Sequence, residues 1–172
     1  MKKSLIILFL FFAGISTAFA QAPSASALVK AFQQTTATNP HPIVDFLNAN
    51  GYTYRFVVNE TGYEAEYLYS KNCKILHEQY SNGVEYSPSP ETAKSSIVRL
   101  FAQGDRVISM NVYAYSPAAF KTWDAQLKAL GYKARYDGAG NRGKSWEYRA
   151  KGKPNISIWN DLSNTYILYI SK

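Results

Sequence analysis

Cysteine is nearly absent from this chain, which has only Cys73 among its 172 residues. No internal disulfide can form, so the fold must be stabilised by packing, unlike the disulfide frameworks of much smaller secreted domains. Only two histidines are present, His41 and His77. A metal site would have to combine His77, Cys73 and carboxylates such as Glu78 without a recognised ligand spacing. We therefore expect neither a metal nor a cofactor.

Signatures of nucleophilic and nucleotide chemistry are also lacking. No GxSxG segment occurs, which removes the nucleophile elbow of serine hydrolases. Residues 138–143 do spell GxGxxG, but a dinucleotide site needs this motif to open a helix. The segment that follows, Lys144–Ala150, has the alternation of a strand, so we interpret the glycines as a hairpin loop. Glu64 and Glu66 lie two apart, which we interpret as a solvated sheet surface rather than a glycosidase pair.

Long hydrophobic runs are confined to the N-terminus. Lys2 and Lys3 precede an apolar run from Leu5 to Ile15, which is followed by Ala18-Phe19-Ala20. This is the pattern of a cleavable secretory signal, and the run is about half as long as a membrane-spanning helix. We expect residues 1–20 to be removed after Ala20. The product would be a periplasmic or secreted protein without stable membrane insertion, and its formal charge would fall from +7 to +5.

Residues 21–40 form a polar segment rich in Ala, Ser, Thr and Gln. Leu28, Val29 and Phe32 are spaced for a short helix that would end before Asn39-Pro40. We interpret this segment as a leader or a weakly docked helix. It would precede a single domain of residues 41–172, a size that buries enough surface to fold alone.

Two segments eighty residues apart have the same pattern. Each predicts a helix that ends at a glycine, Gly51 or Gly131, and passes directly into a strand. Aligned without gaps, Phe46–Phe56 and Gln126–Tyr136 share five of eleven residues. Chance or convergent helix-cap chemistry is the alternative to duplication. We predict two tandem α-β-β-β-β repeats, 41–115 and 116–172, the first with an insertion at 71–94.

The segments after each helix are rich in β-formers. Asn82-Gly83 inside the insertion favours a hairpin. Residues 95–103 could equally form a capped helix, and we favour a strand. The expected strands are Tyr52–Val58, Tyr63–Ser70, Ser95–Ala102 and Arg106–Tyr115 in the first repeat, and Tyr132–Asp137, Lys144–Ala150, Asn155–Trp159 and Thr165–Ser171 in the second.

These elements predict an α+β fold in which helices cover one face of an antiparallel sheet. In overall plan this resembles the tandem-repeat secreted β-lactamase inhibitors and the saddle of the TATA-binding proteins. The resemblance is one of architecture, and it implies no function because one fold serves many.

Charge is uneven along the chain. Residues 60–91 contain six acidic and two basic side chains, whereas residues 121–153 contain nine basic and three acidic ones. In the second half the basic residues are interleaved with aromatic ones, a mixture that can bind nucleic acid. Export argues against nucleic acid and favours an extracytoplasmic protein, glycan or envelope surface.

Aromatic residues are abundant, with 14 tyrosines and three tryptophans. Such side chains combine large contact area with a polar tip, which suits binding surfaces. We expect an exported, non-enzymatic binding domain that recognises a protein or other macromolecule. The alternatives are an envelope or secreted enzyme with an unrecognised site near Cys73, His77 and Glu78, and a structural component in which Cys73 pairs between chains; the oligomeric state stays open. The expected binding residues are Tyr52, Tyr54, Tyr63, Tyr67, Tyr69, Trp146, Tyr148 and Trp159.

Overall fold

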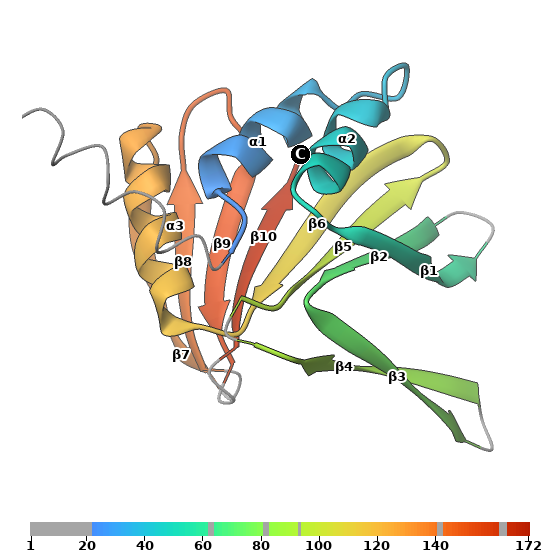
Figure 1. The fold of residues 1–172 in the computed structure, drawn as a ribbon. Coiled ribbons are helices and arrows are strands. Elements are labelled where there is room, and N and C mark those ends of the chain that lie inside the picture. The colour runs from blue at the N-terminus through green and yellow to red at the C-terminus, as the bar shows by residue number, and fades with distance from the viewer. Residues whose placement is uncertain (1–21, 62–63, 81–82, 93, 141–142, 162–164) are drawn as a thin grey trace, which may run out of the picture.

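A computed structural model describes residues 22–61, 64–80, 83–92, 94–140, 143–161 and 165–172 (Figure 1). These residues form three helices and ten strands. The helices are α1 (Ala25–Gln34), α2 (His41–Ala49) and α3 (Pro117–Ala129). The strands are β1 (Thr53–Thr61), β2 (Glu64–Lys71), β3 (Cys73–Tyr80), β4 (Gly83–Pro90), β5 (Ser96–Gln103), β6 (Arg106–Ala114), β7 (Lys133–Gly140), β8 (Gly143–Arg149), β9 (Asn155–Asn160) and β10 (Tyr166–Ser171).

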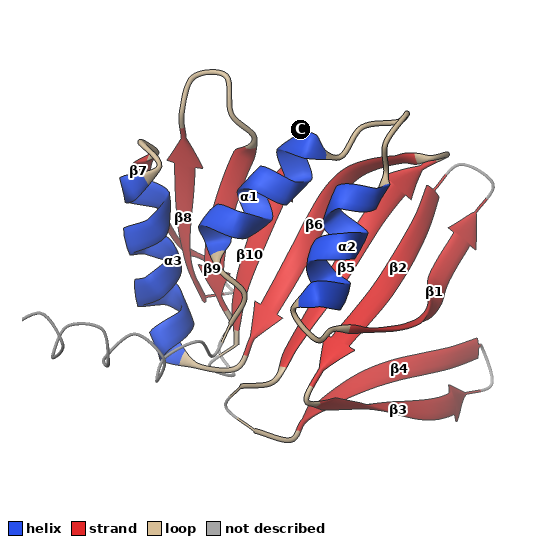
Figure 2. Cartoon of the chain, turned by 45° about the horizontal axis from the view of Figure 1, so that its top comes forward, coloured by secondary structure: helices blue, strands red, loops and turns tan. Residues whose placement is uncertain are grey.

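Eight of the strands form one antiparallel sheet in the order β1-β2-β5-β6-β10-β9-β8-β7. All three helices lie on one face of this sheet (Figure 2). The predicted α+β class is confirmed. The other two strands, β3 and β4, form a separate hairpin that projects away from the sheet beyond β1 and β2 (Figure 1).

Helix α1 is packed into the main core. Its N-cap is Ser24, whose Oγ accepts a hydrogen bond from the Ala27 N–H, and its Leu28 and Phe32 side chains are fully buried. A residue of α3 also binds the first turn of α1, because the Ala25 N–H donates a hydrogen bond to Gln126 Oε1 over 2.7 Å. The helix expected within residues 21–40 is therefore present, but it belongs to the domain and is not a weakly docked leader.

Helices α2 and α3 end in the same way. Gly51 and Gly131 adopt left-handed φ angles of 77° and 85°, which glycine adopts without strain. The next residue, Tyr52 or Tyr132, then donates its N–H back to the carbonyl of Leu47 or Leu127 over 3.0 Å in both cases. A tyrosine thus follows each helix into the core, and both are almost fully buried.

A lysine caps each of these two helix ends. Lys71 Nζ donates to the Asn50 carbonyl and lies 5.9 Å from the Tyr52 ring centroid. Lys153 Nζ donates to the Leu130 carbonyl and lies 5.7 Å from the Tyr132 ring centroid. A cation at a helix C-terminus offsets the partial negative charge of the unpaired carbonyls.

Three local predictions are confirmed. Residues 96–103 form strand β5 and not a helix. The insertion contains the hairpin β3–β4, which pairs from Cys73↔Pro90 to Tyr80↔Gly83. The GxGxxG glycines lie in a strand hairpin, where Gly140 pairs with Gly143, and no helix follows them.

The expected signal, residues 1–20, lies outside the described residues. None of the helices that the described residues form is long and apolar enough to cross a membrane.

The core lies between the helices and the sheet. Strand residues alternate between the two sheet faces, and the apolar members of the central strands point to the helices. These are Val98 and Leu100, Met110 and Val112, Ile156 and Ile158, and Leu168 and Ile170, all at most 2% exposed.

Candidate binding surface on the helix-free face

The face of the sheet opposite the helices, here called the helix-free face, carries a different set of side chains. It is defined by strand register, because residues paired across strands project to the same side. One row runs across the whole sheet, from Phe56 through Leu68, Arg99, Asn111, Tyr169, Ser157 and Glu147 to Arg135. The adjacent row contains Ile97, Tyr113, Ile167, Trp159 and Ser145.

Aromatic rings stand on this face in the central strands. Trp159 of β9 and Tyr169 of β10 are partly exposed, and their ring centroids lie 6.1 Å apart. Tyr113 of β6 and Phe101 of β5 are also partly exposed. Partly exposed tyrosine and tryptophan on a rigid sheet offer large contact area at low entropic cost.

Arginines on this face are held in ion pairs. Arg99 Nε lies 2.8 Å from Glu66 Oε1. Glu147 bridges two more, with Arg135 Nη2 at 3.0 Å and Arg149 Nη2 at 3.5 Å. Asp137 Oδ1, 3.5 Å from Arg135 Nη2, supplies a third carboxylate for the three arginines, and Lys133, paired with Arg149 across β7 and β8, adds one positive charge to the face. A surface for a polyanion instead presents a stripe of unpaired cations.

Glu66 differs from the sequence interpretation. It was expected on a solvated surface with Glu64, but it is only 8% exposed. Its position opposite Phe101 places it beside Arg99, and the ion pair compensates for its burial. The Glu64 side chain lies outside the described ones.

A pocket lies where the β3–β4 hairpin packs against this face. A small apolar cluster joins the hairpin to the sheet, with Leu68, Cys73 and Ile97 buried in it. Next to it is a cavity of about 180 Å³, lined by Leu68, Ile75, Pro88, Ile97, Arg99 and Tyr113. The base of the hairpin therefore packs against Leu68 of β2 and Ile97 of β5, and the rest of the hairpin projects from the sheet (Figure 1).

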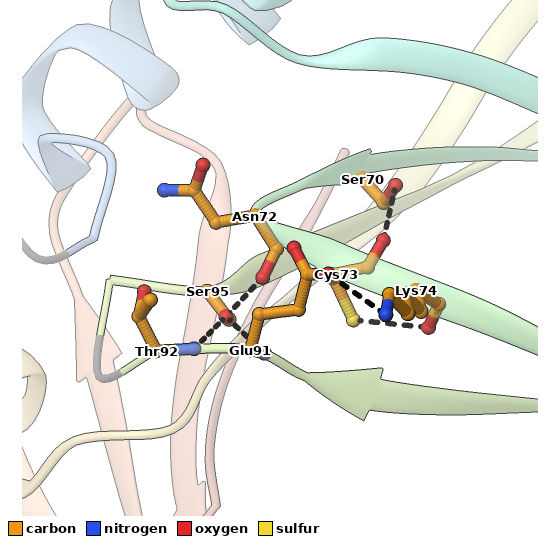
Figure 3. Close-up of polar contacts among 7 residues, drawn as sticks. All are labelled: Ser70, Asn72, Cys73, Lys74, Glu91, Thr92 and Ser95. Carbon is orange, nitrogen blue, oxygen red and sulfur yellow. Dashed lines mark hydrogen bonds and ion pairs between the residues drawn. The ribbon is translucent and has the colours of Figure 1, made fainter.

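Polar contacts hold the hairpin base in place (Figure 3). Ser95 Oγ donates a short hydrogen bond to the Asn72 carbonyl and accepts from the Glu91 and Thr92 N–H groups, both over 3.0 Å. Ser95 is fully buried, whereas its partners Asn72, Glu91 and Thr92 are exposed. These hydrogen bonds fix the point where the chain leaves the sheet after β2 and returns to it at β5.

Among the residues expected to bind, Trp159 lies on the helix-free face. Tyr52, Tyr69 and Tyr148 are at most 6% exposed and belong to the core. Burial raises the pKa of Tyr52 to about 12, while its hydroxyl bonds Ser96 Oγ. The expectation that these three tyrosines form an exposed surface is therefore corrected.

The remaining expected residues lie on the helix side or outside the described part. Tyr67 and Trp146 are partly buried against the core. Tyr54 is 47% exposed, but it pairs with Tyr69 on the helix side. Tyr63 lies outside the described residues.

Arg99, Asn111, Tyr113 and Tyr169 were missed. Their sequence pattern, in which polar or aromatic residues alternate with aliphatic ones, could have indicated a second sheet face. Asn111 and Tyr113 flank the buried Val112, and Tyr169 lies between the buried Leu168 and Ile170. Alternation identifies two faces, but it does not say which one the helices cover.

The residues of the alternative catalytic site lie along one strand. Cys73 and His77 are four residues apart on strand β3, and an extended strand separates such positions by about 13 Å. A nucleophile and its base must lie within about 3 Å. Cys73 is 3% exposed, and burial raises the pKa of its thiol, with a smaller effect from the negative charge of Glu91. The side chains of His77 and Glu78 lie outside the described ones.

Within the described residues no group of three histidine, cysteine, aspartate or glutamate side chains is placed to hold a metal ion. No protein-family model, curated protein or solved structure matches this chain. The helix-free face is accordingly the candidate functional site.

Proposed function

We propose that this protein is an exported, non-enzymatic binding domain that holds a protein partner on the helix-free face of its sheet. The observation that carries the proposal is the composition of that face. Trp159, Tyr169 and Tyr113 stand partly exposed on central strands, beside arginines whose charges are already paired. Aromatic residues and arginine are the residue types enriched in protein interfaces.

A protein partner fits this face better than nucleic acid or an acidic glycan. Polyanions are bound mainly through unpaired cations that displace counterions. On this face the three carboxylates of Glu66, Glu147 and Asp137 form ion pairs with the three arginines, Arg99, Arg135 and Arg149. Neutral aromatic area with satisfied polar groups instead suits the mixed surface of another protein.

We further propose that the sheet arose from two tandem α-β-β-β-β units, 41–115 and 116–172. The sheet order supports this, because β1-β2-β5-β6 and β7-β8-β9-β10 meet at β6 and β10 in mirrored sequence. The matching helix ends add a second line of support, since each has a glycine, a buried tyrosine and a capping lysine at corresponding places. The insertion that contains β3 and β4 then belongs to the first unit.

Alanine variants of two face aromatics test the binding proposal. Immobilised mature domain is used to capture partners from the extracytoplasmic proteins of the producing cell, and the captured partner is titrated against Trp159→Ala and Tyr169→Ala. We expect each variant to weaken binding by about 30-fold, the effect of losing an interface hot spot.

Tyr136→Ala is the matched control for this capture experiment. Tyr136 is 53% exposed, but it pairs with Trp146 on the helix side of the edge strand β7. It should bind like the wild type. Equal loss in Tyr136→Ala, full binding by both face variants in their folded state, or capture of no protein would each contradict the proposal.

A further inference from the structure

We infer that the pocket between the β3–β4 hairpin and the sheet receives one bulky apolar side chain from the protein partner. This inference rests on the proposed function and names the chemistry that the partner must present. The pocket lies on the same face as Tyr169 and Trp159, because Arg99 and Tyr113, which line it, stand in the two rows that contain them.

The size of the pocket matches one side chain. Its volume is about 180 Å³, slightly larger than the ~150 Å³ engineered cavity that binds benzene. Sites for whole drug-sized ligands are larger, about 300–1,000 Å³. A single leucine- or phenylalanine-sized group therefore fills it.

The lining specifies an apolar occupant. Leu68, Ile75 and Ile97 contribute aliphatic walls, and Pro88 and the Tyr113 ring close the sides. Leu68 and Ile97 are at most 4% exposed and sit in the apolar cluster under the hairpin. Burying an aliphatic group against such walls removes apolar area from water, which favours binding.

The polar side of the pocket favours a neutral amide over a carboxylate. Arg99 is the one charged residue among the described residues of the lining, and its Nε lies 2.8 Å from Glu66 Oε1 in an ion pair. An added carboxylate would meet the negative charge of Glu66, whereas a main-chain carbonyl can accept a hydrogen bond from the remaining guanidinium donors.

Asn111 adds an acceptor next to Arg99. The two residues are paired directly across β5 and β6. Asn111 Oδ1 is buried and has no hydrogen-bond partner among the described residues, although buried acceptors are normally paired. Asn111 is not one of the residues that line the pocket, so this acceptor marks an unsatisfied polar position beside the pocket and not a contact within it.

The pocket is formed before any partner binds. The Ser95 hydrogen bonds hold the ends of the hairpin at Asn72 and Glu91, and Ile75 packs against the cluster that contains Leu68 and Ile97. A preformed site avoids the ordering cost of binding. The preformed shape therefore favours binding of a partner side chain in this pocket.

Titration with N-acetyl-leucine amide, followed by methyl NMR of the full mature domain, tests the inference. We expect shifts concentrated on the methyl groups of Leu68, Ile75 and Ile97. N-acetyl-alanine amide should bind about 50-fold more weakly, because its side chain buries about three fewer methylene equivalents. Hexanoate should also bind more weakly than the leucine amide. Shifts spread over other methyls, equal binding of the alanine amide, or tighter binding of hexanoate would overturn the inference.

A variant with a larger side chain in the pocket provides a second test of the inference. Ile75→Trp fills the pocket and should abolish the leucine-amide shifts at Leu68 and Ile97. Leu76→Trp is the matched control, since Leu76 is the next residue on β3, is 48% exposed and points to the opposite face of the strand. Retained binding by Ile75→Trp would overturn the inference. If Ile75→Trp does not fold, the wild-type methyl titration still decides the question.

The two proposals can fail separately. If the leucine amide does not bind but Trp159→Ala still weakens partner capture, the anchor pocket is wrong and the binding face stands. If the pocket binds the amide but Trp159→Ala and Tyr169→Ala leave capture unchanged, the proposed binding face is wrong.

Discussion

Replacing Trp123 by alanine is expected to lower the free energy of unfolding by about 3–5 kcal/mol, the range for deleting a buried aromatic ring. Trp123 is fully buried on α3. Its Nε1–H donates to the Pro23 carbonyl over 2.9 Å, 100 residues away in sequence. The substitution thus removes core volume and also the donor to a carbonyl just before α1. Urea unfolding followed by circular dichroism measures the change.

The control for Trp123→Ala is Lys121→Ala on the same helix. Lys121 is exposed, and surface substitutions usually change stability by less than about 0.5 kcal/mol. A loss below about 1 kcal/mol for Trp123→Ala would contradict the packing of α1 against α3.

Phe32→Ala is expected to lower the free energy of unfolding by a similar amount, about 3–5 kcal/mol. Phe32 is fully buried on α1, and Lys172 Nζ lies 5.5 Å from its ring centroid while donating to the Thr35 carbonyl. Helix α1 thus links the start of the described chain to its last residue.

Thermal and urea unfolding of Phe32→Ala distinguish an integral helix from a leader. Gln33→Ala is the control, because Gln33 is the next residue and is exposed. If Phe32→Ala were as stable as Gln33→Ala, α1 would be a weakly docked segment, as its polar sequence first indicated.

Elements governed by local chemistry could be predicted from the sequence. Helices α2 and α3 end at Gly51 and Gly131 because glycine tolerates the left-handed conformation that closes each helix. A hairpin was predicted near Asn82-Gly83, and β3 and β4 do pair as far as Tyr80↔Gly83. Helix α1 was harder, since its stability comes from distant partners such as Gln126, which no local pattern reveals.

The composition of the binding face could not be predicted, because it depends on register between distant strands. Tyr54 and Phe56 are two residues apart and should share a face. A register shift at Arg55 instead pairs Tyr54 with the helix-side Tyr69 and Phe56 with Leu68 on the helix-free side. Bulges of this kind depend on strand pairing and reverse the sidedness of the residues that follow, here as far as a second register shift between Val57 and Glu60.

Hydroxyl-radical footprinting of the complex tests the central claim, that the partner is held on the helix-free face, most directly. We predict that partner binding protects Trp159 and Tyr169 from oxidation. Tyr136 and Tyr54, the most exposed tyrosines among the described side chains, should be oxidised as in the free protein. Unchanged oxidation of Trp159 and Tyr169, with protection of Tyr136 and Tyr54, would place the partner on the opposite side of the sheet and contradict the account.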